Sequence, residues 1–299
     1  MSTLGRLKQA YLALIPVYPI GYVLVHGFRG DQIWARPYVD RSSEEPSQQL
    51  KELVESELDK VDNVKKAKTN VVLTDEIEPK VFGGLFLTSG AELQFPHRVS
   101  LVDVEQARRH AANLELDLGL SKYRKKVEVN SAVGEELISR LMLSDAAKMF
   151  LVQRQLQIAN SGEFFSVSPF FAWFGISAVG YGVFVVSAMT IGAVPAFLVA
   201  TTFSVLVFRR FLGSFDDYKM KKADEITIRK GETYAQGARD YFDSSMKLNR
   251  LLRTVLGDDG ETNIKKNGDC SLHSHVPFST RRRLVDKIAA EVSATETSS

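Results

Sequence analysis

The sequence predicts an α+β membrane protein that is mostly helical, with three transmembrane helices and a small β-sheet in a soluble domain. Three observations support this fold class. Residues 164–208 form a run of 45 residues without Asp, Glu, Lys or Arg. Residues 10–28 form a second apolar stretch near the start of the chain. Residues 69–102 are rich in β-branched and aromatic residues separated by Gly and Pro, which is typical of short strands.

The uncharged run is long enough for two membrane-spanning helices, because one span needs about 20 apolar residues. Gly192 and Pro195 interrupt the run, so we expect one span at about 168–189 and a second at about 193–212. The alternative is a buried helical hairpin inside a soluble domain, which the lack of charge over the whole run disfavours. Small residues such as Gly180 are expected to pack within this hairpin.

The stretch 10–28 is interpreted as an uncleaved N-terminal anchor, kinked at Pro16 and Pro19. A secretory signal peptide is the competing interpretation, but the apolar part is longer than usual and no clear cleavage site follows it. The first acidic residue is Asp31. A basic, acid-free start is compatible with mitochondrial inner-membrane targeting and equally with a simple signal anchor.

Arg6 and Lys8 predict that the amino terminus stays on the inner side of the membrane. Three spans then place both soluble segments on the outer face, where they can fold into one domain that the hairpin interrupts. The expected organisation is an N-terminal segment 1–30, a soluble α+β part 31–163, a hairpin 164–212, a helical soluble part 213–292 and a disordered tail 293–299.

The soluble segments contain recognisable helix and strand signals. A capping signal at residues 42–45 predicts a helix that runs through Leu58. Strands are expected at 70–74, 81–88 and 98–102, with one more short strand at 127–129. Further helices are expected at 103–118, 132–142 and 145–160. Residues 216–256 are expected to form one long or broken helix, softened at Gly231 and Gly237. A polar loop at 257–283 leads into a final helix that begins near Thr280.

Composition excludes several classes of function. The formal net charge is only +2, and no stripe of basic and aromatic residues predicts nucleic-acid binding. The single cysteine, Cys270, excludes an internal disulfide framework and a cysteine-based zinc cage.

Two stretches and the hairpin between them carry a family resemblance. The first is Leu143–Phe150, LSDAAKMF, and the second is Leu251–Glu261, LLRTVLGDDGE. Gly268, His275, Pro277 and Thr280–Arg282 follow. Together these residues resemble the transmembrane protein 177 family of animal mitochondria. The resemblance is carried by residues 140–290, and the amino-terminal half resembles the family mainly in its layout.

This resemblance implies a mitochondrial inner-membrane protein with three spans and a role in cytochrome c oxidase biogenesis. Its implied partners are oxidase subunit II and the membrane-bound assembly chaperone of that subunit. It also implies that the amino terminus lies in the matrix and the soluble domain in the intermembrane space. On this basis we expect a non-enzymatic assembly or stabilising factor that needs no cofactor and no small-molecule substrate.

The order of elements also resembles membrane-bound zinc metallopeptidases. Their HExxH helix needs two histidines four residues apart and a glutamate base. The corresponding helix here has Arg154, Gln155 and Ile158 instead, and Met220 replaces the ligand glutamate that precedes Ala223-Asp224. The chain is therefore at most an inactive relative of these enzymes, and convergence of the layout by chance is an equal alternative. No catalytic residue is assigned.

One other group of residues suggests metal binding. Cys270, His273 and His275 have spacing that would suit copper, although such residues in a polar loop are more often simply solvated. His97 and His110 are interpreted as isolated, without a catalytic partner. The sequence thus assigns no metal site.

Overall fold

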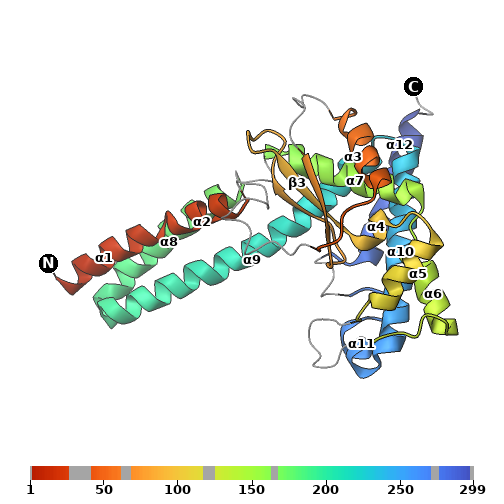
Figure 1. Ribbon diagram of the computed structural model, residues 1–299. Coiled ribbons are helices and arrows are strands. Elements are labelled where there is room, and N and C mark those ends of the chain that lie inside the picture. The colour runs from red at the N-terminus through yellow and green to blue at the C-terminus, as the bar shows by residue number, and fades with distance from the viewer. Residues whose placement is uncertain are drawn as a thin grey trace.

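The structure is a computed structural model of the 299-residue chain. It describes residues 2–26, 42–61, 69–116, 125–162, 168–270 and 276–296. A long helical arm projects from a domain that contains a small sheet and the remaining helices (Figure 1). Most of the described chain is helical, as the sequence predicts.

The arm is built from four helices. Helices α8 (Ser168–Ile191) and α9 (Ala193–Ile228) form the predicted hairpin, which turns at Gly192 with a φ of 88°. The N-terminal segment forms α1 (Thr3–Leu14) and α2 (Val17–His26), with the break at the predicted Pro16 kink. Figure 1 shows α1 and α2 along the hairpin, with the amino terminus near the hairpin tip.

A close contact fixes α1 against the hairpin. The Tyr11 hydroxyl lies 2.8 Å from Ser204 Oγ on α9. A Cβ atom added at Gly180 on α8 would lie 2.0 Å from Ser204 Oγ and 2.3 Å from the Tyr11 hydroxyl. Glycine at this position therefore allows three helices to meet. Nearer the domain, the Trp173 indole donates to the Ile15 carbonyl at 2.6 Å.

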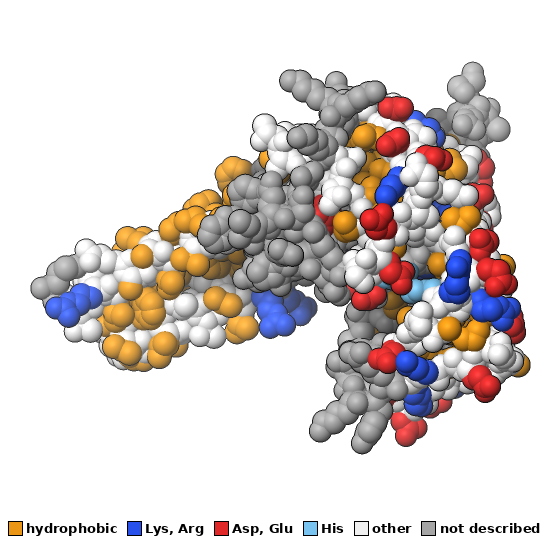
Figure 2. Space-filling view, viewed as in Figure 1, with side chains coloured by type: hydrophobic (Ala, Val, Ile, Leu, Met, Phe, Trp, Pro, Cys, Tyr) orange, Lys and Arg blue, Asp and Glu red, His pale blue; other side chains and the backbone are white. Residues whose placement is uncertain are grey.

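Two helices, α8 from Pro169 and α9, are long and apolar enough to cross a membrane. Most of their apolar side chains point outward rather than into the hairpin; Met189 is 81% exposed and Phe171 is 74% exposed. Figure 2 shows hydrophobic side chains along the arm and basic side chains at both of its ends. A soluble protein would bury such side chains, so the arm has the surface of a membrane-embedded element.

Helix α9 continues beyond the apolar run into the domain. The predicted separation between a span ending near 212 and a helix beginning at 216 is wrong, because one helix continues up to Ile228. The predicted weak point at Gly231 is confirmed: the chain breaks there, with a φ of 149°, and α10 (Glu232–Leu256) follows. The predicted softening at Gly237 is wrong. A Cβ there would lie 2.0 Å from the Ala146 carbonyl oxygen, so this glycine permits close helix packing.

The sheet has three strands in the order β1-β3-β2. Strand β1 (Thr69–Thr74) pairs in parallel with β3 (Ala91–Pro96), and β2 (Lys80–Gly83) pairs antiparallel with β3. The first predicted strand is confirmed, and the second ends five residues earlier than expected.

The third predicted strand, 98–102, is wrong. Residues His97–Ser100 form the short helix α4, and the central strand β3 lies just before it. Every residue of β3 is buried. Its polar side chains are hydrogen-bonded. Glu92 accepts from Asn70 on the neighbouring strand β1 at 3.1 Å and from Gln94 on its own strand at 2.9 Å. Because Glu92 and Gln94 interrupt the apolar residues of β3, the hydropathy pattern did not predict this central strand.

The domain core draws on residues before and after the hairpin. Helices α3 (Gln48–Leu58) and α7 (Asp145–Asn160) pack with the sheet, α10 and α12 (Phe278–Glu296) around one cluster of buried apolar side chains. A second cluster lies between α5 (Val104–Asn113), α6 (Ala132–Leu141) and the end of α10. Ser144 caps α7 as its sequence predicts, since its Oγ accepts from the Ala147 amide at 3.2 Å.

Several local predictions need correction. The cap of α3 is Ser47 rather than a residue of 42–45. Residues 127–129 form no strand. The predicted polar loop contains α11 (Asp258–Asn263) and a β-bridge between Ile264 and Cys270. The tail expected from 293 is helical as far as Glu296, because α12 extends to that residue. Helix α5 ends at Asn113, and the predicted continuation beyond residue 116 lies outside the described residues.

Candidate functional site

A buried cluster of four charged side chains lies where the arm enters the domain. Glu78 comes from the β1–β2 connection, Arg154 from α7, Asp224 from α9 and Arg281 from α12. Arg281 donates from Nε to Asp224 Oδ2 at 2.7 Å and from Nη2 to Asp224 Oδ1 at 2.9 Å. Its Nη1 donates to Glu78 at 3.0 Å. Arg154 Nη2 donates to the other Glu78 oxygen at 2.9 Å, and its Nη1 lies 3.7 Å from Asp224.

This cluster is electrically balanced, which permits its burial. Arg154, Asp224 and Arg281 are each no more than 2% exposed. Removing charges from water is costly unless each is paired and hydrogen-bonded, and here two guanidinium groups face two carboxylates. The guanidinium of Arg281 also lies 4.6 Å from the centre of the Phe242 ring. The cluster thus joins the arm helix α9 to three other elements of the domain.

The protonation equilibria reflect this arrangement. Burial acts to raise the pKa of Glu78, but the positive charges of Arg281 and Arg154 outweigh it, so the pKa is lowered. Burial acts to lower the pKa of Arg281, but Asp224 and Glu78 outweigh it and raise that pKa. Glu78 and Arg281 are therefore held in their charged forms.

Arg154 and Asp224 were both singled out by the comparison with zinc peptidases. The structure does bring these two residues together, but Arg154 supplies N–H donors, and a guanidinium is not a metal ligand. Gln155 is buried beside it, and Ile158 is half-buried on the same helix. Sequence reasoning missed Glu78 and the pairing of Arg281. No local signal identifies ionic partners that are 203 residues apart.

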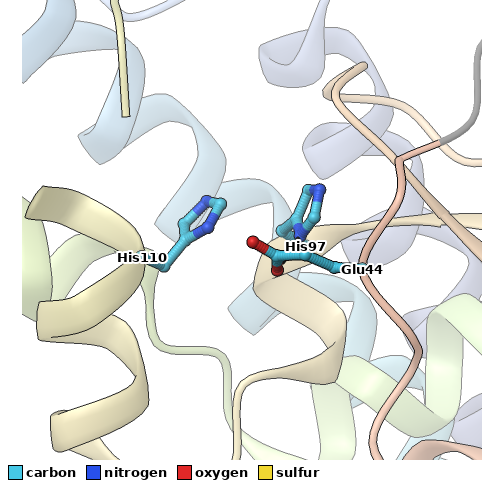
Figure 3. Close-up of side chains that lie close together, drawn as sticks. All are labelled: Glu44, His97 and His110. Carbon is cyan, nitrogen blue, oxygen red and sulfur yellow. Dashed lines mark ion pairs between the residues drawn. The ribbon is translucent and has the colours of Figure 1, made fainter. Parts of the chain in front are cut away.

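A second group of polar side chains lies around His97, which directly follows the central strand β3. The imidazole of His97 stacks on that of His110, with ring centres 4.7 Å apart. His97 Nδ1 lies 3.1 Å from Glu44 Oε2, and His97 Nε2 lies 3.2 Å from Asp75 Oδ1. In Figure 3 the Glu44 carboxylate lies between the two imidazole rings in the view shown. A cavity of about 310 Å³ opens beside this group.

The interpretation of His97 and His110 as isolated residues is therefore wrong. His97 begins α4 directly after β3, and His110 lies in the last turn of α5. The packing of α5 beside the sheet places the two rings in contact. Neither histidine has a sequence motif that predicts a site, because the contact between them depends on how two separate helices pack.

Of the three residues considered for copper, the structure describes only Cys270. Cys270 is 3% exposed and belongs to the second apolar cluster. His273 and His275 lie outside the described residues. The copper hypothesis stays a prediction, and Cys270 is a core residue rather than part of a solvated loop.

The fold and these sites define a membrane-anchored α+β protein whose arm and soluble domain are joined through a buried ion-pair cluster. A family model described as Transmembrane protein 177 matches residues 2–297, so the chain belongs to that family. This match extends the resemblance from residues 140–290 to essentially the whole chain. No curated protein and no solved structure matches it, so the peptidase-like arrangement stays a hypothesis.

Proposed function

We propose that the protein is a non-enzymatic assembly and stabilising factor of the mitochondrial inner membrane. In this proposal it supports the biogenesis of cytochrome c oxidase subunit II through the assembly chaperone of that subunit. Family membership supports the choice of process, and the construction of the arm supports the mode of action.

The observation that carries the mode of action is the continuity of α9. This helix extends from the hairpin tip at Ala193 to Ile228, and its last turns hold Asp224 in the buried cluster. Since the lipid-facing helix and the domain core share one uninterrupted helix, a partner held by the arm has a fixed position relative to the domain. Such coupling suits a protein that presents a membrane protein to a soluble factor.

The arm also offers a surface for a partner within the membrane. Its outward apolar side chains include Phe171, Val179, Val186, Met189, Leu198 and Leu206. Packing of small and apolar side chains drives helix association in lipid. A newly inserted transmembrane helix therefore fits this surface by its chemistry, as does the bilayer itself.

The proposed topology has three spans, with the N-terminal helices as the third. Arg6 and Lys8 lie in the first turns of α1, and Arg209 and Arg210 follow the apolar part of α9. The 16 residues 193–208 of α9 precede these arginines, so the apolar part of this helix is roughly 24 Å long. With the amino terminus in the matrix, the domain lies in the intermembrane space. Labelling of single introduced cysteines in mitoplasts tests this orientation.

Crosslinking in intact mitochondria tests the proposed partners. A photoreactive amino acid at Val186, which is 67% exposed, is expected to capture oxidase subunit II or its assembly chaperone. The same group at Phe184, which is 0% exposed, is the matched control and should form only intramolecular products. Recovery of no oxidase subunit or assembly factor from Val186, or from lysine crosslinks on the domain, would defeat the proposal.

The alternative of a metallopeptidase relative makes a different prediction. An active peptidase would cleave membrane-protein substrates, and its activity would depend on ligands in α7. Arg154, Gln155 and Ile158 occupy the positions in question, which supports a non-enzymatic role. Proteolysis by the purified chain that a metal chelator abolishes would favour the enzyme instead.

A further inference from the structure

The geometry points to a divalent transition-metal site formed by Glu44, His97 and His110, with Zn²⁺ as the cation that these ligands fit best. One potential ligand atom from each of the three residues lies within 4.8 Å of the others. This inference concerns residues outside the buried charge cluster and does not depend on the proposed role in oxidase assembly.

The environment of His97 supports a cation. Both of its ring nitrogens lie within 3.2 Å of a carboxylate oxygen, one from Glu44 and one from Asp75. A metal-bound imidazole keeps one N–H group, so it can hold a cation at one nitrogen and donate to a carboxylate from the other. With Zn²⁺ bound by Nδ1 and Glu44, Nε2–H would donate to Asp75, whose oxygen is 3.2 Å away. A carboxylate that orients a metal-bound histidine in this way is a frequent second partner in zinc sites.

His110 provides the second nitrogen ligand. Its ring stacks on that of His97, with ring centres 4.7 Å apart, and its ligand atom lies within 4.8 Å of those of His97 and Glu44. Imidazole ligands favour zinc and copper over magnesium and calcium. A set of two histidines and one carboxylate is common for zinc and leaves a fourth position for water.

The surroundings are favourable in charge and space. Glu44 and Asp75 are mostly exposed, with 60% and 73% of their side-chain surfaces accessible, so their carboxylates can move by the short distance that ligation needs. Glu45 and Arg109 also line the cavity beside the histidines. Lys51 lies 3.8 Å from Glu45, so three carboxylates face two fixed cations here, and the excess of carboxylates favours a bound cation.

Ligation would connect three separate parts of the domain. Glu44 precedes α3, His97 follows β3 and His110 belongs to α5. The segment before α3 is already held by a hydrogen bond from the Ser47 amide to Ser100 Oγ at 2.7 Å. A bound ion would clamp this segment, which follows the N-terminal helices, to the sheet and to α5.

Metal binding by the full-length chain in detergent tests the inference. After treatment with EDTA and removal of the chelator, the protein is titrated with ZnCl₂ in a calorimeter, and bound zinc is counted by mass spectrometry. We expect one zinc per chain and a higher unfolding temperature in its presence. Co²⁺ serves as a spectroscopic probe, whose visible absorption reports the nitrogen and oxygen ligands.

Variants distinguish this site from the other candidate. His110→Ala and Glu44→Gln each remove a ligand, so each is expected to weaken zinc binding by more than the roughly 10–100-fold that loss of an outer-shell partner costs. His110→Ala should also remove the cobalt absorption. The matched control replaces Cys270, His273 and His275 together and should leave binding unchanged. Glu44→Gln also covers the case in which the histidine variant fails to fold, because Glu44 is exposed.

Two results would overturn the site. One is the absence of stoichiometric zinc in the folded wild-type chain. The other is zinc binding that survives unchanged in both Glu44→Gln and His110→Ala. Its loss in the triple control would then assign the metal to Cys270 and its neighbours instead.

Discussion

Arg281 and Asp224 form a bidentate pair in the interior of the protein, with N–O distances of 2.7 and 2.9 Å. Arg281 lies on the last helix of the domain, and Asp224 lies on the helix that continues from the membrane arm. The pair therefore connects the carboxyl-terminal part of the chain to the arm. Its contribution to the free energy of unfolding is best measured by removing the charge of one partner.

Asp224→Asn should strongly destabilise the domain. The change leaves two buried guanidinium groups with one carboxylate, and breaking a buried pair costs about 3–5 kcal/mol. Urea unfolding in detergent, followed by circular dichroism, measures this loss. Asp243→Asn is the matched control, because Asp243 pairs with Arg282 at the surface and should cost about 1 kcal/mol or less. Equal losses in the two variants would contradict the assigned role of the buried cluster.

Glu78 should make stability depend on acid pH. Burial acts to raise the pKa of Glu78, but the charges of Arg281 and Arg154 lower it by more than burial raises it. The folded-state pKa therefore lies below the ordinary value of 4.5. A lowered carboxyl pKa stabilises the fold above the ordinary value, and this contribution disappears as pH falls through the folded-state pKa. We therefore expect stability to decline below about pH 4.5. Glu78→Gln should be less stable at neutral pH and should show a shallower decline. An unchanged slope in this variant would count against the prediction.

Gly180 should be needed for docking of the N-terminal helix. Gly180→Leu places atoms where Ser204 and Tyr11 now lie, so α1 is expected to move away from the hairpin. Trp173, which bonds to Ile15, can report the movement by its fluorescence in a Trp34→Phe background. We expect a changed emission maximum and a lower unfolding temperature. Gly182→Leu is the matched control, since no atom lies within 4 Å of a Cβ there, and it should leave the spectrum unchanged.

Gly237 should set the distance between α7 and α10. In Gly237→Ala the new Cβ meets the backbone of Ala146 at 2.0 Å, and backbone cannot rotate away. Overpacking of this kind costs about 1–3 kcal/mol. Gly213→Ala on α9 is the control, because its surroundings are open and alanine favours a helix by roughly 0.5–1 kcal/mol. The unfolding temperature should fall in Gly237→Ala and rise in Gly213→Ala. An unchanged unfolding temperature in Gly237→Ala would contradict the close packing of α7 and α10.

The sequence indicated the parts of this protein whose signals are local. The apolar run gave the hairpin and its turn at Gly192, since lipid demands uninterrupted hydrophobicity over a whole helix. Ser144 and the helical spacing of apolar residues after it predicted α7, since capping and helical periodicity involve residues only a few positions apart. The break near Pro16 was also foreseeable, because proline removes a backbone donor.

Only the tertiary structure decided which distant side chains meet. It made β3 the central strand, although Glu92 and Gln94 interrupt its apolar pattern. It assembled Arg154, Asp224, Arg281 and Glu78 into one ion-pair cluster, and it stacked His97 on His110 beside Glu44. The physical reason is that burial and pairing of charges depend on how the helices pack around the sheet. Residues 203 positions apart become partners only when the core closes around them.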